Sequence, residues 1–415
     1  MLIFFTFLTV SCNNKKNTHS FSFPLNVIPV EKTVGNYNIL NLSEYVTDIK
    51  YIPLETNDAS LISRIHQIIY ENEKILILDF TEGPKKCYLF DNNGKFCQKI
   101  GQRGQGPDDY LYINNVSMYD NFIYLMDVRK IFIYDTNGSL IEKNNLRTNE
   151  IPEEYFLGNL FSIMPLKKDT FIMDVVSTGS YPIAILFEIY QSNAKAINEY
   201  PGYVKLNKVS QRASTDELGK MYRFKDEVRT YKIINDTIFT IGQSLEMKEA
   251  FIFELGKYRP TLSFIEGKEG NRGFDLINAR NKYIIPQTIY ESVNHLFIGL
   301  HFGNHAPEPI ELTNSQGGQY FNGDVYGIFD KRTGELTLMS QPIKGKLGFK
   351  NDIDNGPVIW PRYISSNNEL VTYISVEDFL DYYEKIENPT PQMTEIAKNI
   401  KMDDNPIVII AKLKE

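Results

Sequence analysis

Three of the five histidines lie within eleven residues, a density that is typical of a metal site. They are His295, His301 and His305. Imidazole nitrogens are common zinc ligands, and His301 with His305 could hold a divalent metal. No helical HExxH pattern and no thiolate partner accompanies them, so surface or loop histidines are the alternative interpretation.

A second candidate for metal binding is the acidic stretch that begins at Asp352. Asp352, Asp354 and Asn355 precede Gly356 as in the opening of a calcium-binding loop. The twelfth position of such a loop needs a bidentate carboxylate, and here it is Tyr363. An ordinary turn is therefore the alternative, and the chain is predicted to need no cofactor other than such a divalent metal.

The glycines Gly101, Gly104 and Gly106 resemble a phosphate-binding loop. The run lacks the Lys-Ser/Thr ending of a P-loop and does not open a helix, so a connection between strands is the favoured interpretation. Arg103 projects from this run and could pair with an anionic ligand. Tyr110, which ends the run, is a further candidate binding residue.

Two more candidate binding residues lie in a long connection near the C-terminus. Trp360 is the only tryptophan of the chain and could stack on a sugar ring or anchor a protein partner, or fill a gap between structural units. Arg362 follows it closely. No serine or cysteine nucleophile stands out with a partnered base.

These residues must be positioned by strands, because short β-branched and aromatic runs punctuated by Asn, Asp and Gly dominate residues 45–375. A polar turn pair followed by a strand recurs six times. The pairs are Asn72-Glu73, Asp120-Asn121, Lys168-Asp169, Asn235-Asp236, Val293-Asn294 and Asn368-Glu369. Their second residues are separated by 48, 48, 67, 58 and 75 positions, which indicates a common unit with insertions in the later copies.

A second recurrence supports this register. Turns that begin with Asp and end with Gly follow strands in YLFDNNGKF, FIYDTNGSL and IFDKRTGEL, and they predict the outer hairpins of the units. Repeats of about 40–50 residues with four strands each are typical of a β-propeller. The sequence therefore predicts an all-β, six-bladed β-propeller of four-stranded antiparallel blades.

The C-terminal region is predicted to close this ring. The apolar run 406–413 should complete a blade together with strands from the N-terminal part. Before it, Ser375 resembles a capping residue of a helix with apolar residues at helical spacing, and a second helix is predicted over about 392–401. The two helices would form a short insertion at about 375–402.

The N-terminus has the features of an export signal. Residues 1–10 are almost wholly apolar and too few to cross a bilayer. The stretch Leu8 to Cys12 resembles a bacterial lipobox, so we expect a signal peptide over 1–11, lipidation of Cys12, a tether over 12–26 and one propeller domain over 27–415. A chance cysteine in an ordinary signal peptide is the alternative.

The net charge bears on the possible partners, and the two other cysteines bear on a possible disulfide. A net charge of −8 argues against nucleic acid as a partner. Cys87 and Cys97 flank a predicted hairpin turn, and an export compartment would permit a disulfide between them. Two unlinked cysteines in adjacent strands are the alternative.

Four stretches of the chain resemble a known family. They are Tyr51 to Thr56, Tyr88 to Tyr110, Asn351 to Gly356 with Trp360-Pro361, and the strand that follows Asp404-Asn405-Pro406. Together they resemble the six-bladed β-propeller lipoproteins of Gram-negative gut bacteria. This resemblance implies a lipoprotein of the cell envelope, in the outer membrane, and brings no catalytic residues with it. Lys15 and Lys16 follow Cys12 where acidic residues favour surface display, so a periplasm-facing anchor is favoured.

Two functions fit these features. The first is an envelope-anchored module that binds a glycan, a peptide or a partner protein, since a repeat scaffold is present without a catalytic constellation. The second is a metal-dependent lyase or hydrolase with its active site at the central channel. The second requires His301, His305, Asp352 or Arg103 to meet at that channel.

Overall fold

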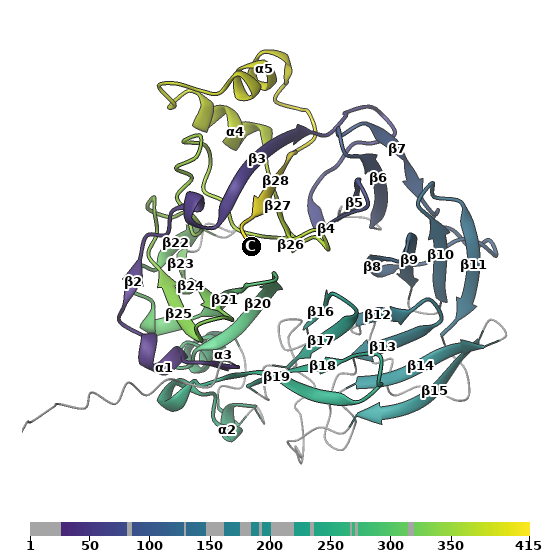
Figure 1. Ribbon diagram of the computed structural model, residues 1–415, viewed down its shortest axis with the longest axis horizontal. Coiled ribbons are helices and arrows are strands. Elements are labelled where there is room, and N and C mark those ends of the chain that lie inside the picture. Colours follow the sequence, from purple (N-terminus) through teal and green to yellow (C-terminus); the bar gives the residue numbers. More distant parts are fainter. Residues whose placement is uncertain are drawn as a thin grey trace, which may run out of the picture.

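A computed structural model describes residues 26–80, 85–127, 130–146, 162–174, 184–190, 193–200, 220–232, 236–265, 268–269, 273–313 and 319–415. In these residues the strands form sheets that are arranged in a ring around a central axis (Figure 1). The predicted β-propeller is confirmed. Residues 1–25, which include the predicted signal peptide, Cys12 and nearly all of the tether, lie outside the described residues.

Two of the sheets have four strands each. From the centre outwards, one contains β26 (Tyr363–Ile364), β27 (Glu369–Ile374), β28 (Ile407–Leu413) and β3 (Val46–Pro53). The next contains β4 (Ile65–Glu71), β5 (Lys74–Asp79), β6 (Lys86–Asp91) and β7 (Phe96–Ile100).

The third sheet has eight strands and corrects the predicted blade count. Its first half is β8 (Ile113–Tyr119), β9 (Phe122–Asp127), β10 (Lys130–Asp135) and β11 (Leu140–Asn145). Its second half is β12 (Ser162–Lys167), β13 (Thr170–Asp174), β14 (Ala184–Tyr190) and β15 (Asn193–Tyr200). The outer strands β11 and β15 pair in parallel at Asn145 and Asn193. Counted as continuous sheets, the described strands make five blades, so the prediction of six separate blades is wrong.

The remaining two blades have five strands each, not four. One contains β16 (Lys220–Phe224), β17 (Glu227–Tyr231), β18 (Thr237–Ile241), β19 (Met247–Phe253) and β1 (Val27–Ile28). The other contains β20 (Ile285–Glu291), β21 (His295–His301), β24 (Asp324–Asp330), β25 (Glu335–Met339) and β2 (Tyr37–Asn38). In each, an N-terminal strand adds in parallel to the outer edge. The N-terminal segment therefore fastens two blades before it reaches β3.

Short elements fill the connections. A separate hairpin joins β22 (Ile310–Thr313) and β23 (Gln319–Asn322). The helices are α1 (Val30–Thr33), α2 (Leu262–Ile265), α3 (Gly273–Arg280), α4 (Val376–Tyr383) and α5 (Pro391–Asn399), with 3-10 turns η1 (Leu42–Glu44), η4 (Gly256–Tyr258) and η5 (Gly303–His305). No described helix has both the length and the apolar character needed to cross a membrane.

The first two predicted turn pairs have the backbone geometry of tight hairpins. Asn72 and Glu73 have φ values of 50° and 59°, and Asp120 and Asn121 have 50° and 63°. Two consecutive residues with positive φ are typical of type I′ turns, whose twist matches that of the flanking strands. Each pair joins the innermost strand of its unit to the second strand.

The buried strand β5 shows how the blades hold one another. Ile75, Leu76, Ile77 and Leu78 are all fully buried. Because side chains alternate along a strand, Leu76 and Leu78 pack with residues of β8 and β9, whereas Ile75 and Ile77 pack with residues of β27 and β28. Each sheet is therefore covered on both faces by its neighbours, which explains the continuous apolar runs.

The predicted closure of the ring is confirmed. β28 pairs with β3 in antiparallel fashion from Ile407 opposite Pro53 to Leu413 opposite Val46. Next to this pairing, the Asn405 amide accepts a hydrogen bond from Ile62 N at 2.8 Å and donates to Glu55 O and Ser60 O, both at 2.8 Å. The closing strand is thus held by its backbone and by one buried side chain.

The predicted helical insertion is also confirmed, as α4 and α5. The Ser375 hydroxyl accepts a hydrogen bond from Asp378 N and caps α4. In α5, the Gln392 amide donates to Tyr51 O at 3.1 Å and accepts from Tyr51 N at 3.5 Å. The insertion therefore covers the outer edge of β3, which would otherwise present free backbone groups (Figure 1).

The two cysteines do not form a disulfide. Cys87 is buried and free, and Cys97 is exposed and free. Cys87 lies opposite Ile100, and a bulge between the pairs Leu89–Gln98 and Phe90–Phe96 contains Cys97. The hairpin turn therefore does not bring the two sulfur atoms opposite each other.

We expect Asn405→Ala to lower the free energy of unfolding by about 3 kcal/mol, because each buried group left without its partner costs roughly 1–3 kcal/mol. Urea denaturation of the full chain measures this loss. Asn399→Ala is the matched control, since its exposed amide bonds only to Glu395 within α5, and should change stability by less than about 0.5 kcal/mol. Equal losses in the two variants would contradict the role of Asn405 in closure.

Candidate functional site

The innermost strands of the units surround a central channel (Figure 1). These strands are β4, β8, β12, β16, β20 and β26. Residues of all six line a cavity of about 280 Å³ in the middle of the channel. A second cavity, of about 410 Å³, extends from it towards the ends at which β4, β8 and β12 begin. We call the second cavity the channel mouth.

The two cavities are continuous along the wall, since seven residues line both. They are Gln67, Ile68, Met164, Lys220, Met221, Tyr290 and Arg362. The residues found only at the mouth are mostly polar, and include His66, Asn114, Asn115 and Ser162. The mouth therefore offers hydrogen-bonding groups in front of a more apolar interior.

Amide side chains join neighbouring strands of the wall. Gln67 Nε2 donates to Val116 O at 2.9 Å, and Gln67 Oε1 accepts from Val116 N at 3.3 Å. Asn115, 48 positions later, bonds to Ile163 O at 2.8 Å and to Ile163 N at 3.4 Å. These bonds satisfy backbone groups at the inner edges of β8 and β12 and fix the spacing of the wall.

Cationic side chains crowd around His66 at the mouth. Lys85 Nζ lies 3.2 Å from His66 Nε2 and donates to Asn114 O at 3.3 Å. Solvent reaches His66, yet protein atoms enclose enough of the ring that desolvation lowers its pKa to about 4, with further lowering by Lys85, Arg64 and Lys220. His66 is therefore neutral at pH 7 and accepts a hydrogen bond from Lys85 through Nε2.

Arg362 adds a further cation from the neighbouring blade, which contains β26 and β27. Its guanidinium carbon lies 5.5 Å from the centre of the Tyr373 ring, and its backbone N–H donates to Val371 O at 2.9 Å. Stacking on an aromatic ring orients the planar guanidinium. Among the described residues, neither Arg362 nor Lys220 forms an ion pair with a carboxylate.

The carboxylate that lines the inner cavity is already neutralised. Glu291 is fully buried and lies 3.1 Å from Arg229 Nε and 3.0 Å from Lys331 Nζ. No aspartate or glutamate is among the described residues that line the mouth. The mouth is therefore a positively charged site without a counter-charge in the described wall.

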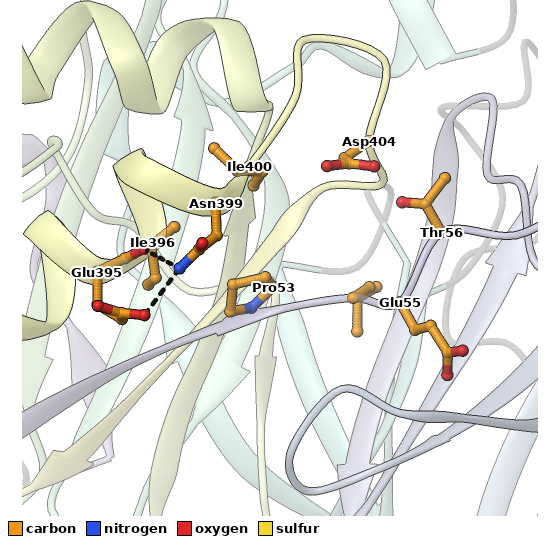
Figure 2. A pocket seen from close by; sticks show the side chains of 9 residues that line it. Pro53, Glu55, Thr56, Glu395, Ile396, Asn399, Ile400 and Asp404 are labelled. Atoms are coloured by element: carbon orange, nitrogen blue, oxygen red, sulfur yellow. Dashed lines mark hydrogen bonds between the residues drawn. The ribbon is translucent and has the colours of Figure 1, made fainter.

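A different pocket, of about 350 Å³, lies outside the ring between the end of β3 and α5 (Figure 2). Its polar groups are satisfied within the protein: Glu55 accepts from Phe96 N, Asp404 accepts from Lys401 N, and Asn399 donates to Glu395. This groove offers fewer free groups to a ligand than the channel mouth does.

The predicted binding residues lie in three different settings. Arg362 lines both channel cavities. Arg103 is exposed, with its guanidinium 5.5 Å from the Tyr112 ring, and does not line either cavity. Tyr110 is buried, and its hydroxyl donates to Lys85 O at 3.2 Å, so it supports the backbone that carries Lys85.

Trp360 lies in the core between blades. Its ring stacks on Tyr326 with centroids 4.5 Å apart, and it packs against Phe297 and Phe349. Only 9% of Trp360 is exposed. The structure therefore places it where it fills a gap between structural units, the alternative that the sequence left open.

The predicted metal-binding residues do not come together. His301 contacts Asn281 at 3.1 Å, and His305 contacts Lys282 O at 3.0 Å. Asp352 accepts from Ser43 N and Oγ at 2.9 and 2.6 Å, and Asp354 accepts from Gly356 N at 2.9 Å. In the part of the chain that the structure describes, no three His, Cys, Asp or Glu side chains form a metal-binding group.

Sequence reasoning missed His66, Lys85 and Lys220. Each is a single charged or polar residue at or near a strand, and no local motif surrounds it. One signal was available: Gln67 and Asn115 occupy equivalent positions 48 residues apart, which marks them as members of the innermost strands.

The family model described as "Domain of unknown function (DUF4934)" matches residues 25–412. The chain belongs to this family. No curated protein matches the chain.

Solved structures with the same architecture are distant in sequence. A Bacteroides fragilis protein, described as a predicted exported protein, is 18% identical with a TM-score of 0.65, and the match covers 94% of this chain and 100% of that one. At this identity the likeness supports the fold alone. Weaker matches include a streptogramin B lyase (9% identity, 89% and 99% coverage, TM-score 0.41) and a Bacteroides caccae protein of unknown function (10%, 68% and 82%, 0.36). TM-scores below 0.5 carry no weight for this chain.

We expect His66 to remain uncharged from pH 7 down to about pH 5, since its pKa is lowered to about 4. Replacing Lys85 with Met removes a cation 3.2 Å from the ring and should raise the pKa of His66. Nitrogen-15 NMR of the imidazole across the pH range measures both values. A His66 pKa near 6.5 in the unmodified protein, or no rise in the variant, would contradict the crowding of cations at the mouth.

Proposed function

We propose that this protein is an exported, envelope-anchored binding module that receives a glycan, a peptide or part of a partner protein in its channel mouth. The observation that carries the proposal is the set of unpaired polar groups around a preformed cavity of about 410 Å³. Lys220 and Arg362 both line this cavity, and neither forms an ion pair with a carboxylate of the described residues. Preformed concave sites with a few convergent polar groups are typical of ligand binding.

The envelope address is supported by the sequence before the propeller. An apolar segment ends at Leu8 to Cys12, in the pattern of a lipidated cysteine, and a polar tether follows. The name of the Bacteroides fragilis protein also refers to export. We propose an outer-membrane lipoprotein with the propeller on the periplasmic side.

Binding without catalysis is favoured over a metal-dependent lyase or hydrolase. The enzyme hypothesis rested on residues that would meet at the channel, and His301, His305, Asp352 and Arg103 do not line its described wall. The carboxylate of that wall, Glu291, is engaged by two cations and is poorly placed to act as a base.

A variant that fills the mouth tests the location of binding. We expect a ligand from a panel of glycans and peptides to raise the melting temperature of the full-length protein, because ligand at about 100 times its Kd adds roughly 2.7 kcal/mol of stability. Ser162→Trp should abolish this shift, since Ser162 lines the mouth. Ser244→Trp, at an exposed position after β18, should retain it.

The same pair of variants separates the alternatives. A shift that survives Ser162→Trp would place the ligand elsewhere and overturn the channel as the site. A shift that requires a divalent metal and disappears with a chelator would favour the enzyme hypothesis instead.

A further inference from the structure

We propose that the channel mouth is an oxyanion-binding site, which takes a carboxylate, sulfate or phosphate group carried by the ligand. This inference deepens the proposed function and rests on it. It assigns the ligand class from the charge and geometry of Lys220 and Arg362, which line the cavity. Arg64 and Lys85 lie beside His66 and add positive charge behind its wall.

The first argument is the absence of a counter-charge in the described wall. Lys220 and Arg362 line the same cavity and belong to strand-bearing segments 142 residues apart in sequence, brought together by the ring. The Arg64 guanidinium lies 5.5 Å from the centre of the Phe80 ring, and among the described residues Lys85 bonds to the neutral groups His66 Nε2 and Asn114 O. Like charges held together without an anion repel one another, and a bound anion would relieve this repulsion.

Two carboxylates behind the wall are otherwise engaged: Asp79, and Asp174, which attracts Lys220 but lies 2.9 Å from Lys232 Nζ. Asp79 ends β5 opposite Ile65, is fully buried, and does not line the mouth. Its Oδ1 accepts hydrogen bonds from Ser63 N at 3.0 Å and Arg64 N at 2.9 Å. Asp79 therefore holds the start of β4 in place from behind the wall, and the cavity surface keeps its positive charge.

The second argument is the type and setting of the donors. A guanidinium presents a planar fork of N–H groups that matches the two oxygens of a carboxylate or a phosphate. Tyr373 lies beside the Arg362 guanidinium and orients this fork. Ser162 lines the same cavity and brings a neutral hydroxyl group to it.

The neutral state of His66 agrees with this assignment. Desolvation contributes most to the lowered pKa of His66, and Lys85, Arg64 and Lys220 lower it further, so an anionic group that enters the mouth would meet these same cations. The ring also leaves its Nδ1–H as a donor while Nε2 accepts from Lys85.

Matched ligands test the class directly. Isothermal titration of the full-length protein at low ionic strength would use sodium sulfate, inorganic phosphate, D-glucuronate and D-glucose as probes. We expect at least one oxyanion to bind with a Kd below roughly 10 mM, and glucuronate, which differs from glucose only by its carboxylate, to bind about tenfold more tightly than glucose. The three anions show whether the group is a carboxylate, a sulfate or a phosphate.

Arginine variants test the site. Arg362→Gln should weaken binding of the best oxyanion by about tenfold or more, and Arg362→Lys, which keeps the charge and loses the fork, should weaken it less. Arg103→Gln is the matched control, because Arg103 is exposed and outside both cavities, and should leave the affinity unchanged. Circular dichroism and the melting temperature of each variant confirm that it is folded.

The outcomes separate this inference from the proposed function. If no oxyanion binds, if glucose binds as tightly as glucuronate, or if Arg362→Gln leaves the affinity unchanged, the oxyanion site is overturned. A neutral ligand whose binding is lost in Ser162→Trp and retained in Arg362→Gln would overturn the ligand class and leave the binding module intact. Oxyanion binding that persists in Ser162→Trp would overturn both.

Discussion

The antiparallel pairing of β28 with β3 joins the last strand of the chain to a strand of its N-terminal part and holds the ring closed. Every blade depends on this closure, because each sheet buries both faces against its neighbours and an open ring would expose two of those faces. The N-terminal segment extends the closure, since β1 and β2 add to the outer edges of two other blades before β3 begins. Asn405 and Gln392 then protect the ends and edge of the closing strands with side-chain hydrogen bonds.

Closure also creates the channel mouth, because the residues that line the mouth come from blades that are far apart in the sequence. His66 and Lys85 come from one blade, Lys220 from the blade across the channel and Arg362 from the closing blade.

Buried aspartates contribute to the alignment of the inner strands. Asp79 accepts two backbone hydrogen bonds before β4, and Asp127, 48 residues later, accepts one from Leu111 N at 2.7 Å before β8.

Much of the fold was predictable because it depends on local patterns. The first two turn pairs form tight hairpins, the run after Pro406 is the closing strand, and Ser375 caps a helix. The blade count was not predictable, since the contact of Asn145 with Asn193 joins two outer strand edges and leaves no periodic signal in either strand. The strands β1 and β2 have two residues each, too few for alternation to reveal them.

The site was less predictable than the fold, because its members share no motif. Arg362 was selected for its place in a long connection, and Trp360 was selected with it although it packs in the core. The sequence analysis favoured dense groups of chemically active residues, such as the histidines near position 301. In the structure these histidines bond to separate partners and do not line the channel wall. These scattered single residues form a site only because the closed ring brings their blades together around the channel.

The channel wall shows why the positive charge is more than a consequence of the fold. Gln67 and Asn115 lie opposite Leu78 and Met126, one position before Asp79 and Asp127, and their amides satisfy the neighbouring strands. Lys220 occupies the equivalent position on β16, opposite Tyr231. A neutral amide would meet the needs of the wall there, whereas a lysine adds charge beside other cations and satisfies no wall carbonyl among the described residues. Residues that depart from what local structure favours concentrate at functional sites. Here the departing residue is Lys220, and it supplies positive charge to a cavity that a ligand can enter.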